Sequence, residues 1–535
     1  MKTASSGWPG LVLVVMALAA LQLWLRPLLP VDETRYLSVA WEMWQRGDFL
    51  VPHLDGVPYS HKPPLLFWLV HGLWWLTGVS EAIARWVFPL VTLLCLWLSA
   101  ALARRLWPHA DAELAAAVPW LLFGGLFWMN FYSLVQFDLL LVLAALLAWH
   151  GTLLALVRPL RGWSLVATAI GIGVLAKGPV ILLPVLPVLL LAPWWARDQR
   201  PGSWSGWYAG TVLALLLGAV IALVWAIPAG LSAGDSYRQA IFWGQSAGRM
   251  VDSFAHASPW WSYLWWLPLM WLPWVLWPQL WKALRAGIST GLDDGIRFCL
   301  AALLPALLLF SLVSGKQGKY LLPLFPLIAL LLAHWLTEFD DRPTPAYRLY
   351  FVAVLLALVG FVLLALPHLG VAAAWSAGLQ PLWALLLLAG AVACLTMKPT
   401  SLVVTLRCCV VAMALATAVV YLSLVPALRP AFDLQPVASH VANLQAAQRP
   451  VAWLGKYHGQ LHFLGRMDQR IEPLTHSEAL RSWTAAHPQG YLIENQRNVT
   501  SALPAGVFTQ AYRSGRLAVW PVSVWREHSH DSGTE

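Results

Sequence analysis

The sequence predicts an all-α polytopic membrane protein with a small C-terminal α/β domain. The chain has 535 residues, of which 59% are hydrophobic and only 11% are charged, whereas roughly half of a soluble domain is apolar. Apolar stretches close to the ~20 residues that span a bilayer recur through most of the chain. They are continuous rather than alternating, so we expect helices and not the strands of a membrane barrel.

About thirteen transmembrane helices are expected from these stretches. The N-terminal stretch follows Lys2 and stays apolar as far as Leu29, which predicts an uncleaved first span. The apolar runs place the spans near 9–29, 84–103, 112–130, 138–157, 163–177, 180–196, 207–229, 260–281, 296–314, 319–336, 347–367, 380–396 and 402–426. A further apolar segment, 64–79, is only about 16 residues long, so we expect a helix lying in the outer interface.

Positive charge indicates which loops lie inside. If Lys2 is inside and 64–79 does not cross, the inner loops hold a series of basic pairs: Arg104 and Arg105, Arg158 and Arg161, Arg197 and Arg200, Lys282 and Arg285, Arg342 and Arg348, and Lys398 and Arg407. This distribution follows the positive-inside rule. It explains the net charge of +9 without nucleic acid as a partner.

The same topology collects the polar stretches on the outer side of the membrane. They are 30–63, Asp138, Lys177, 230–259, 314–320 and the residues after about 427. We therefore expect a transmembrane domain, 1–426, whose first outer loop covers 30–80, and an outer domain, 427–535. In the outer domain, 451–465, 490–495 and 516–525 are typical of short strands. Polar loops that converge on one face are what an extracytoplasmic active site needs.

The first outer loop begins with the sequence DETRY, residues 32–36. Carboxylates at the end of a membrane span are costly unless they are paired or functional. Asp32 and Glu33 are therefore candidate catalytic acids. Arg35 is a candidate cation for the lipid phosphate and is also close enough in sequence to pair with either acid. The alternative is structural: a helix cap and a salt bridge that hold a juxtamembrane helix.

Two further candidates interrupt apolar sequence. Lys62 precedes two prolines that fix the backbone and hold the lysine at headgroup depth, where it could bind a lipid phosphate or simply snorkel. Asp138 is a lone acid between apolar runs, hence a candidate functional group or an N-cap. Lys177, before a Gly-Pro turn, is interpreted as capping a helix C-terminus.

The later outer loops supply further cations. Arg249 is the strongest phosphate candidate, because a guanidinium can grip two phosphate oxygens. Lys316 and Lys319 lie in the glycine-containing turn SGKQGKY, where they could bind a lipid phosphate or snorkel. The five cysteines lie in apolar runs without a metal-binding pattern, and no nucleotide-binding motif is present, so no cofactor is indicated.

The sequence resembles the polyprenyl-phosphate-dependent membrane glycosyltransferases, namely the aminoarabinose transferases of lipid A and the related protein O-mannosyltransferases. The segments that carry the resemblance are DETRY (32–36), GDFLVPHLDGVPYSHKPPLLFW (47–68), the Asp138 region, AKGPV (176–180) and SGKQGKYLLPLFP (314–326). The match covers most of 9–336 and is weaker beyond. It implies a GT-C-like fold with thirteen spans, outer juxtamembrane helices and a C-terminal extracytoplasmic domain.

The resemblance also implies a function and a set of roles. A sugar would pass from undecaprenyl phosphate to a glycolipid, glycan or protein acceptor at the periplasmic face of the bacterial inner membrane. Asp32 and Asp138 match the family's two acids, and Lys62 and Arg249 match the cations that hold the donor phosphate. A transporter or lipid flippase is the alternative, although no inverted repeats are visible.

The chain departs from the family at a position linked to metal binding. Relatives often carry Glu before the lysine of the KPP motif and His shortly before the arginine of the later loop, a pair that can hold a metal. Here His61 stands at the first position and Gly244 to Gln245 at the second. The resemblance therefore implies no certain cofactor and leaves the dependence on a divalent metal open.

Overall fold

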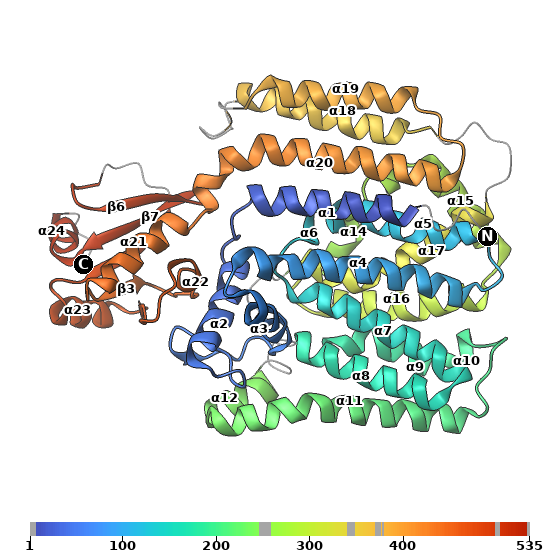
Figure 1. Ribbon diagram of the computed structural model, residues 1–535, viewed down its shortest axis with the longest axis horizontal. Coiled ribbons are helices and arrows are strands. Elements are labelled where there is room, and N and C mark those ends of the chain that lie inside the picture. Colours follow the sequence, from blue (N-terminus) through green and yellow to red (C-terminus); the bar gives the residue numbers. More distant parts are fainter. Residues whose placement is uncertain are drawn as a thin grey trace. The chain divides into compact units, whose positions relative to one another are not determined.

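Figure 1 shows a computed structural model, which describes residues 7–244, 258–339, 348–369, 376, 379–497 and 503–531. The chain divides into two compact units. Unit 1 comprises 1–22, 60–66 and 82–421, and unit 2 comprises 23–59, 67–81 and 422–535. Both the N-terminal sequence and the first outer loop are therefore shared between a helical bundle and a second unit that contains a sheet.

Unit 1 is a bundle of helices whose axes run roughly alongside one another (Figure 1). Neighbouring pairs include α7 with α8, α8 with α11, α9 with α16, and α18 with α19. The helices are α1 (Trp8–Leu25), α4 (Glu81–Leu106), α5 (Ala112–Gly124), α6 (Leu126–Phe131), α7 (Phe137–Val157), α8 (Pro159–Lys177), η2 (Pro179–Ile181), α9 (Leu182–Leu190), α10 (Ala192–Trp195), α11 (Trp204–Ser232), α12 (Asp235–Gln239), η3 (Ala240–Gly244), α14 (Ser262–Met270), η4 (Trp274–Leu276), α15 (Pro278–Thr290), α16 (Asp294–Leu312), η5 (Gly318–Leu324), α17 (Phe325–Glu338), α18 (Tyr350–Ala365), η6 (Leu366–His368), α19 (Pro381–Thr396) and α20 (Leu402–Phe432).

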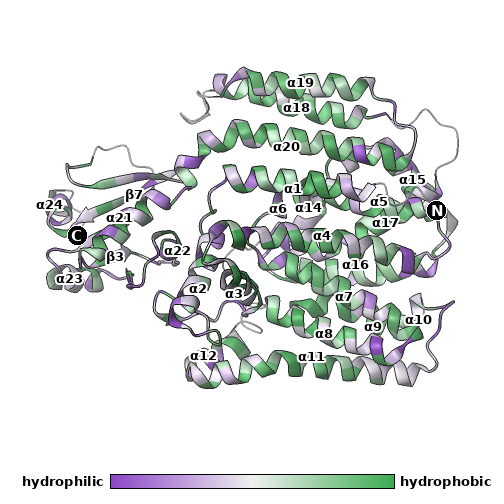
Figure 2. Cartoon of the chain, viewed as in Figure 1, coloured by the Kyte–Doolittle hydropathy of each residue, from purple (hydrophilic) through white to green (hydrophobic). Residues whose placement is uncertain are grey.

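Among the residues that the structure describes, nine helices are long and apolar enough to cross a membrane. Helix α11, for example, has 29 residues. At 1.5 Å per residue it is about 44 Å long, which exceeds the ~30 Å thickness of the hydrocarbon core. Its N-cap is Ser203, whose Oγ accepts a hydrogen bond of 3.0 Å from the Gly206 amide. Its exposed Leu213, Leu216 and Val224 suit contact with lipid tails, and hydrophobic residues colour much of the bundle in Figure 2. The prediction of a multi-pass membrane protein is confirmed.

Some expected spans are interrupted at prolines. The segment 180–196 contains α9 and the short α10, and 260–281 contains α14, which ends at Met270, and the start of α15 at Pro278. Proline lacks an amide hydrogen and cannot sit in a helix interior without local disruption. The number of about thirteen crossings stays a prediction.

The ambiguous segment 64–79 forms a helix of 13 residues, α3 (Leu65–Thr77). At 1.5 Å per residue it is about 20 Å long, short of the hydrocarbon core. Within unit 2, Nε2 of His71 lies 2.8 Å from the Ala40 carbonyl oxygen, and Trp68 Nε1 donates to the Phe49 carbonyl at 2.7 Å. The first contact attaches α3 to the neighbouring helix α2 (Asp32–Arg46), and the second attaches it to the loop that follows α2.

Unit 2 contains a five-stranded mixed sheet in the order β4-β3-β5-β7-β6. β3 pairs in parallel with β4 and β5, whereas β7 pairs antiparallel with β5 and β6. Three of its strands overlap the three strand segments expected from the sequence. The strands are β3 (Val451–Leu454), β4 (Glu472–Leu474), β5 (Tyr491–Arg497), β6 (Phe508–Tyr512) and β7 (Gly515–Pro521), and the helices are α21 (Gln435–Ala446), α22 (His462–Gly465), α23 (Ser477–Ala486) and α24 (Val522–Asp531).

Alternating residues of the strands face two separate cores. Trp453 and Val519 pack with Val441 of α21 on one face, while Leu492 and Ala518 pack with Trp483 and their neighbours on the other. Successive side chains of a strand point to opposite faces, so a central strand covered on both sides is apolar at every position. This explains the apolar run of β7, Leu517–Trp520, whereas the last four residues of the expected strand segment 516–525 belong to α24.

The first outer loop packs against the C-terminal segment inside unit 2. Ser38 Oγ accepts a hydrogen bond of 3.0 Å from the Phe463 amide, and Trp41 Nε1 donates to the Met467 carbonyl at 3.0 Å. Trp74 stacks on Phe463 with ring centroids 5.6 Å apart. The loop also forms a hairpin, β1 (His53–Leu54) with β2 (Val57–Pro58). The sequence does not indicate this grouping of the first loop with the sheet.

Candidate functional site

Asp138 lies in the first turn of α7 and is buried. Its carboxylate forms an ion pair with Lys177 at the end of α8. The cap position of α7 is Gln136, whose side chain makes no capping hydrogen bond. The interpretation of Asp138 as an N-cap is therefore wrong, and the acid is held by a cation from the next helix instead.

Lys177 is a site residue that sequence reasoning missed. Its Nζ pairs with Asp138 and lies 4.4 Å from the ring centroid of Tyr320, in η5. The Gly-Pro turn after Lys177 suggested only a helix cap. A second signal was present in the sequence, because a buried acid in a membrane protein needs a cation nearby. Lys177 is the next cation after Asp138 among the loops predicted to lie on the outer side.

Two other lysines contact the same turn of α7. Lys62 Nζ lies 5.6 Å from the ring centroid of Phe137. Lys319 Nζ donates to Gln136 Oε1 at 3.3 Å. Residues 136–138 are therefore contacted by lysines from three separate segments of unit 1, and we call these residues and lysines the α7 cluster.

The α7 cluster has an excess of positive charge. Lys62, Lys177 and Lys319 carry three positive charges against the single negative charge of Asp138. The N-terminus of α7, a helix of 21 residues, adds partial positive charge and amide donors. Such an arrangement suits a phosphate, which a lysine binds as a point charge.

Lys316 has a different environment although it lies near Lys319 in sequence. The side chain is buried, and its Nζ donates to the Val313 carbonyl at 2.6 Å and the Ser258 carbonyl at 3.0 Å. These bonds tie the turn after α16 to the residues before α14. The geometry of Lys316 favours a structural role. The last phosphate candidate, Arg249, lies outside the described residues.

The two acids of the first loop differ in accessibility. Glu33 is buried, forms an ion pair with Arg26 and accepts a hydrogen bond of 2.9 Å from the Leu29 amide. Asp32 pairs with Arg35 at 2.6 Å, but its side chain is 35% exposed. Asp32 can therefore meet a substrate, whereas Glu33 stabilises the start of α2. The prediction that Arg35 pairs with one of these acids is confirmed.

The predicted site residues thus form two groups. In unit 1 the structure brings Lys62, Asp138 and Lys319 into the α7 cluster. In unit 2, Asp32, Glu33 and Arg35 lie within the first turn of α2.

Known proteins similar in sequence support the resemblance. Residues 61–226 match the family described as dolichyl-phosphate-mannose-protein mannosyltransferase. The undecaprenyl phosphate-alpha-4-amino-4-deoxy-L-arabinose arabinosyl transferase 1 of Pseudomonas fluorescens is 30% identical over 64% of this chain and 60% of its own length. The corresponding transferase of Pseudomonas aeruginosa is 32% identical over 57% of this chain and 55% of its own length. The chain therefore spans between about half and two thirds of these relatives, and the resemblance to this family is confirmed.

Solved structures show the same fold over almost the whole chain. ArnT from Cupriavidus metallidurans in the apo state matches with a TM-score of 0.74 at 19% identity, covering 97% of this chain and 98% of that one. The same protein bound to undecaprenyl phosphate matches with a TM-score of 0.73 at 20% identity, covering 96% and 98%. The protein therefore has the fold of ArnT.

Proposed function

We propose that this protein is a membrane glycosyltransferase, which moves a sugar from a polyprenyl-phosphate donor to lipid A, another envelope glycan or a protein. The observation that carries the proposal is the α7 cluster, in which three lysines surround a helix N-terminus beside a buried acid. A phosphate headgroup at the membrane surface matches this charge. The named relatives, which are undecaprenyl-phosphate aminoarabinose transferases, support the same chemistry.

The proposed step exchanges one bond at the sugar. The bond between the anomeric carbon and the donor phosphate oxygen breaks, and a bond to an acceptor oxygen forms. Lys62 and Lys319, together with Arg249, stabilise the negative charge on the leaving phosphate. Asp138, which Lys177 holds in place through their ion pair, stabilises positive charge on the sugar.

Asp32 completes the proposal on the acceptor side. If the acceptor is a hydroxyl, Asp32 takes its proton. If the acceptor is a phosphate, no base is needed and Asp32 orients it. The donor phosphate ester supplies the driving force, so no nucleotide enters the step. Because His61 replaces the glutamate of the family's metal pair, no step is assigned to a metal at that position.

The topology belongs to the proposal as well. We place the protein in the bacterial inner membrane, with the first outer loop, 30–80, and the C-terminal domain, 427–535, in the periplasm. The positive-inside distribution supports this orientation. A transporter or flippase would share many spans, but no relative named above is a transporter.

A comparison of lipid extracts tests the function. Membranes with the wild type and the Asp32→Asn variant at matched expression are extracted, and polyprenyl-phosphate sugars and envelope glycolipids are measured by mass spectrometry. Loss of one sugar from a glycolipid, with accumulation of its lipid-linked donor, would identify the sugar and support transfer. Unchanged donor and glycan pools would exclude Asp32 from the reaction and favour a transporter.

A further inference from the structure

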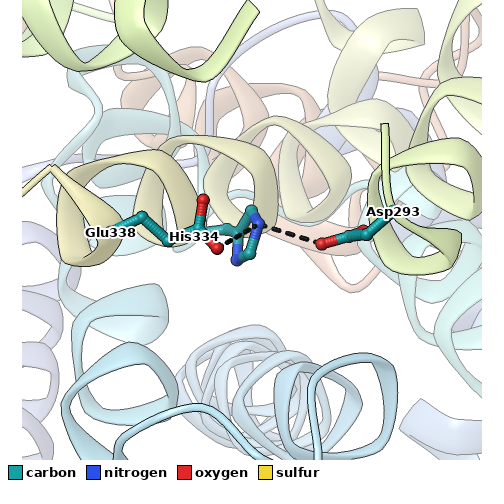
Figure 3. A group of neighbouring side chains, drawn as sticks. All are labelled: Asp293, His334 and Glu338. Atoms are coloured by element: carbon teal, nitrogen blue, oxygen red, sulfur yellow. Dashed lines mark ion pairs between the residues drawn. The ribbon is translucent and has the colours of Figure 1, made fainter. Parts of the chain in front are cut away.

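Asp293, His334 and Glu338 bring three potential metal ligands together at one end of α16 and α17 (Figure 3). Asp293 is the N-cap of α16, and the other two residues lie one turn apart near the end of α17. One nitrogen or oxygen atom from each side chain lies within 4.8 Å of the other two. Among the residues that the structure describes, no other group of three His, Cys, Asp or Glu side chains has its ligand atoms this close together.

The imidazole of His334 is buried but lacks hydrogen bonds. The residue is 3% exposed, and neither ring nitrogen has a hydrogen-bond partner. Nε2 nevertheless lies 3.1 Å from Asp293 Oδ2 and 3.4 Å from Glu338 Oε1. Unsatisfied buried polar atoms are rare and call for an explanation, such as a water or an ion that they share.

The spacing of these atoms matches a coordination shell. Zinc lies about 2.1 Å from nitrogen and oxygen ligands in tetrahedral geometry, so two of its ligands are about 3.4 Å apart. The distances of 3.1 and 3.4 Å fall close to this value. Two carboxylates and a neutral imidazole carry a charge of about −2, which a divalent cation balances.

Neighbouring residues hold the aspartate and the histidine in place. Trp107 Nε1 donates to Asp293 Oδ2 at 2.9 Å, and the Trp107 ring stacks on His334 with centroids 4.4 Å apart. Asp293 Oδ1 accepts a hydrogen bond of 2.6 Å from the Ile296 amide. A Cβ on Gly295 would lie 2.5 Å from the Trp107 ring, so glycine is required there. Oriented ligands of this kind are typical of metal sites.

We propose that Asp293, His334 and Glu338 bind one divalent transition-metal ion, zinc in the first instance, which links α16 to α17. The side chains of Asp293 and Glu338 are 41% and 53% exposed, so the ion can reach the site and a water can complete its shell.

The metal site is separate from the α7 cluster. Lys319 and Glu338 lie at opposite ends of the continuous apolar segment Gly318–Glu338, which is about 30 Å long at ~1.5–2.0 Å per residue. The ion would therefore stabilise the bundle and take no part in sugar transfer, so the proposal stands or falls independently of the proposed function.

Metal analysis of the purified full-length protein tests the site. The protein is treated with chelator, supplied with Zn²⁺, desalted and assayed for zinc by mass spectrometry. We expect about one zinc per chain, and an affinity at least ~10-fold lower in Glu338→Gln and His334→Gln, since even outer-shell changes cost 10-fold or more. Because Glu338 is half exposed, its variant will keep its fold even if the His334 variant does not.

Matched controls locate the ion. Exposed Glu478 and His368 provide the control variants Glu478→Gln and His368→Gln, which should bind zinc like the wild type. Co²⁺ should give visible absorption bands in the wild type that Glu338→Gln lacks. No bound metal in the wild type, or zinc lost only in His61→Ala, would overturn the proposal.

Discussion

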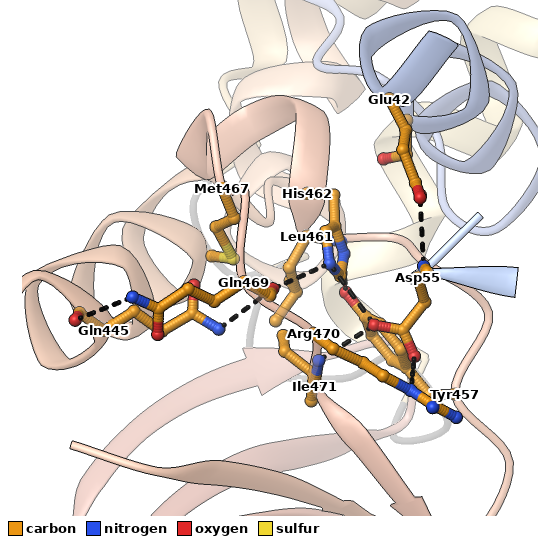
Figure 4. A network of polar contacts seen from close by, with 12 residues as sticks. Glu42, Asp55, Gln445, Tyr457, Leu461, His462, Met467, Gln469, Arg470 and Ile471 are labelled. Carbon is orange, nitrogen blue, oxygen red and sulfur yellow. Dashed lines mark hydrogen bonds and ion pairs between the residues drawn. The ribbon is translucent and has the colours of Figure 1, made fainter. Parts of the chain in front are cut away.

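His462 lies against Asp55 in the interior of unit 2, with its Nε2 3.3 Å from Asp55 Oδ1 (Figure 4). Asp55 and Gly56 form the turn between β1 and β2, and both have positive φ angles, 54° and 80°, as a two-residue hairpin turn requires. The Ile471 amide donates to Asp55 Oδ1 at 2.8 Å. The Asp55 side chain thus fixes the tip of the first-loop hairpin to the C-terminal segment.

Burial disfavours charge on both partners. It raises the pKa of Asp55 to about 7, although the Ile471 amide and Arg470 oppose the shift. It also lowers the pKa of His462 to about 4. Asp55 therefore holds a proton in the folded protein at a pH where an unfolded chain, with a pKa near 3.8, has lost it.

The first prediction concerns stability and pH. Between about pH 4 and 7 the folded state binds more protons at Asp55 than the unfolded state does. The contribution of Asp55 to the free energy of unfolding is therefore present at low pH and is lost as the pH rises to about 7. The Asp55→Asn variant cannot titrate there. We expect the free energy of unfolding of Asp55→Asn, relative to wild type, to rise by up to about 1.4 kcal/mol per pH unit over this range.

Thermal unfolding of both proteins in detergent, followed from about pH 5 to 8, measures this difference. The control is Asp468→Asn, because Asp468 is exposed and its curve should run parallel to that of the wild type. A parallel curve for Asp55→Asn as well would show that Asp55 is ionised throughout.

The second prediction separates the two acids of the first loop. Glu33→Gln removes the ion pair of the buried Arg26 guanidinium with Glu33, which should lower stability by about 3–5 kcal/mol. Asp32→Asn breaks a partly exposed pair, which should cost at most ~1 kcal/mol. If Asp32 is the acceptor base, however, its variant should lose about 100-fold or more in transfer rate.

Unfolding temperature and initial transfer rate, measured on the same preparations, distinguish these effects. A stable and fully active Asp32→Asn protein would contradict the role given to Asp32. An unstable one would mean that its pair with Arg35 is structural.

The sequence predicted those features that arise from local patterns. Continuous apolar runs indicate membrane helices, and the run 516–525 indicates a strand, which the structure places at Gly515–Pro521. The contact between Ser38 and Phe463 joins residues 425 positions apart, and no local pattern contains that information. The hairpin and the C-terminal sheet could therefore not be placed in one unit before the structure was known.

In the candidate site, too, local sequence identified individual residues but not their contacts in space. Asp138 was found because an acid is unusual in apolar sequence, and the structure places it in an ion pair. Lys316 and Lys319 look equivalent in sequence, yet one binds backbone carbonyls and the other contacts α7. A lysine is long enough to reach several partners, so its neighbours in space, and not in sequence, decide its role.

The third prediction concerns the ion pair between Asp138 and Lys177. Lys177→Met removes the ion-pair partner of a buried carboxylate and should lower stability by about 3–5 kcal/mol. Adding Asp138→Asn removes that charge as well, so the double variant should recover most of the stability but not the transfer activity. A double-mutant cycle of unfolding free energies measures the coupling. Additive effects of the two substitutions would show that the residues do not interact.

The fourth prediction compares the two lysines of the SGKQGKY turn. Lys319→Gln removes a positive charge from the α7 cluster, and losing one charge-assisted contact of about 1.5–3 kcal/mol should raise the KM for the lipid-linked donor about 10- to 100-fold. Lys316→Gln instead leaves the Val313 and Ser258 carbonyls without their donor, which should lower Tm with little change in KM.

Donor KM and Tm measured for both variants test the assignment of one lysine to the substrate and the other to the fold. The two substitutions are chemically identical and only three positions apart, so each serves as the control for the other. A raised KM in Lys316→Gln at unchanged Tm would reverse the assignment, because it would mean that the ammonium leaves its carbonyl partners to bind the donor. Equal KM values in both variants and the wild type would remove this turn from the phosphate site and leave Lys62 and Arg249 as the cations that bind the donor.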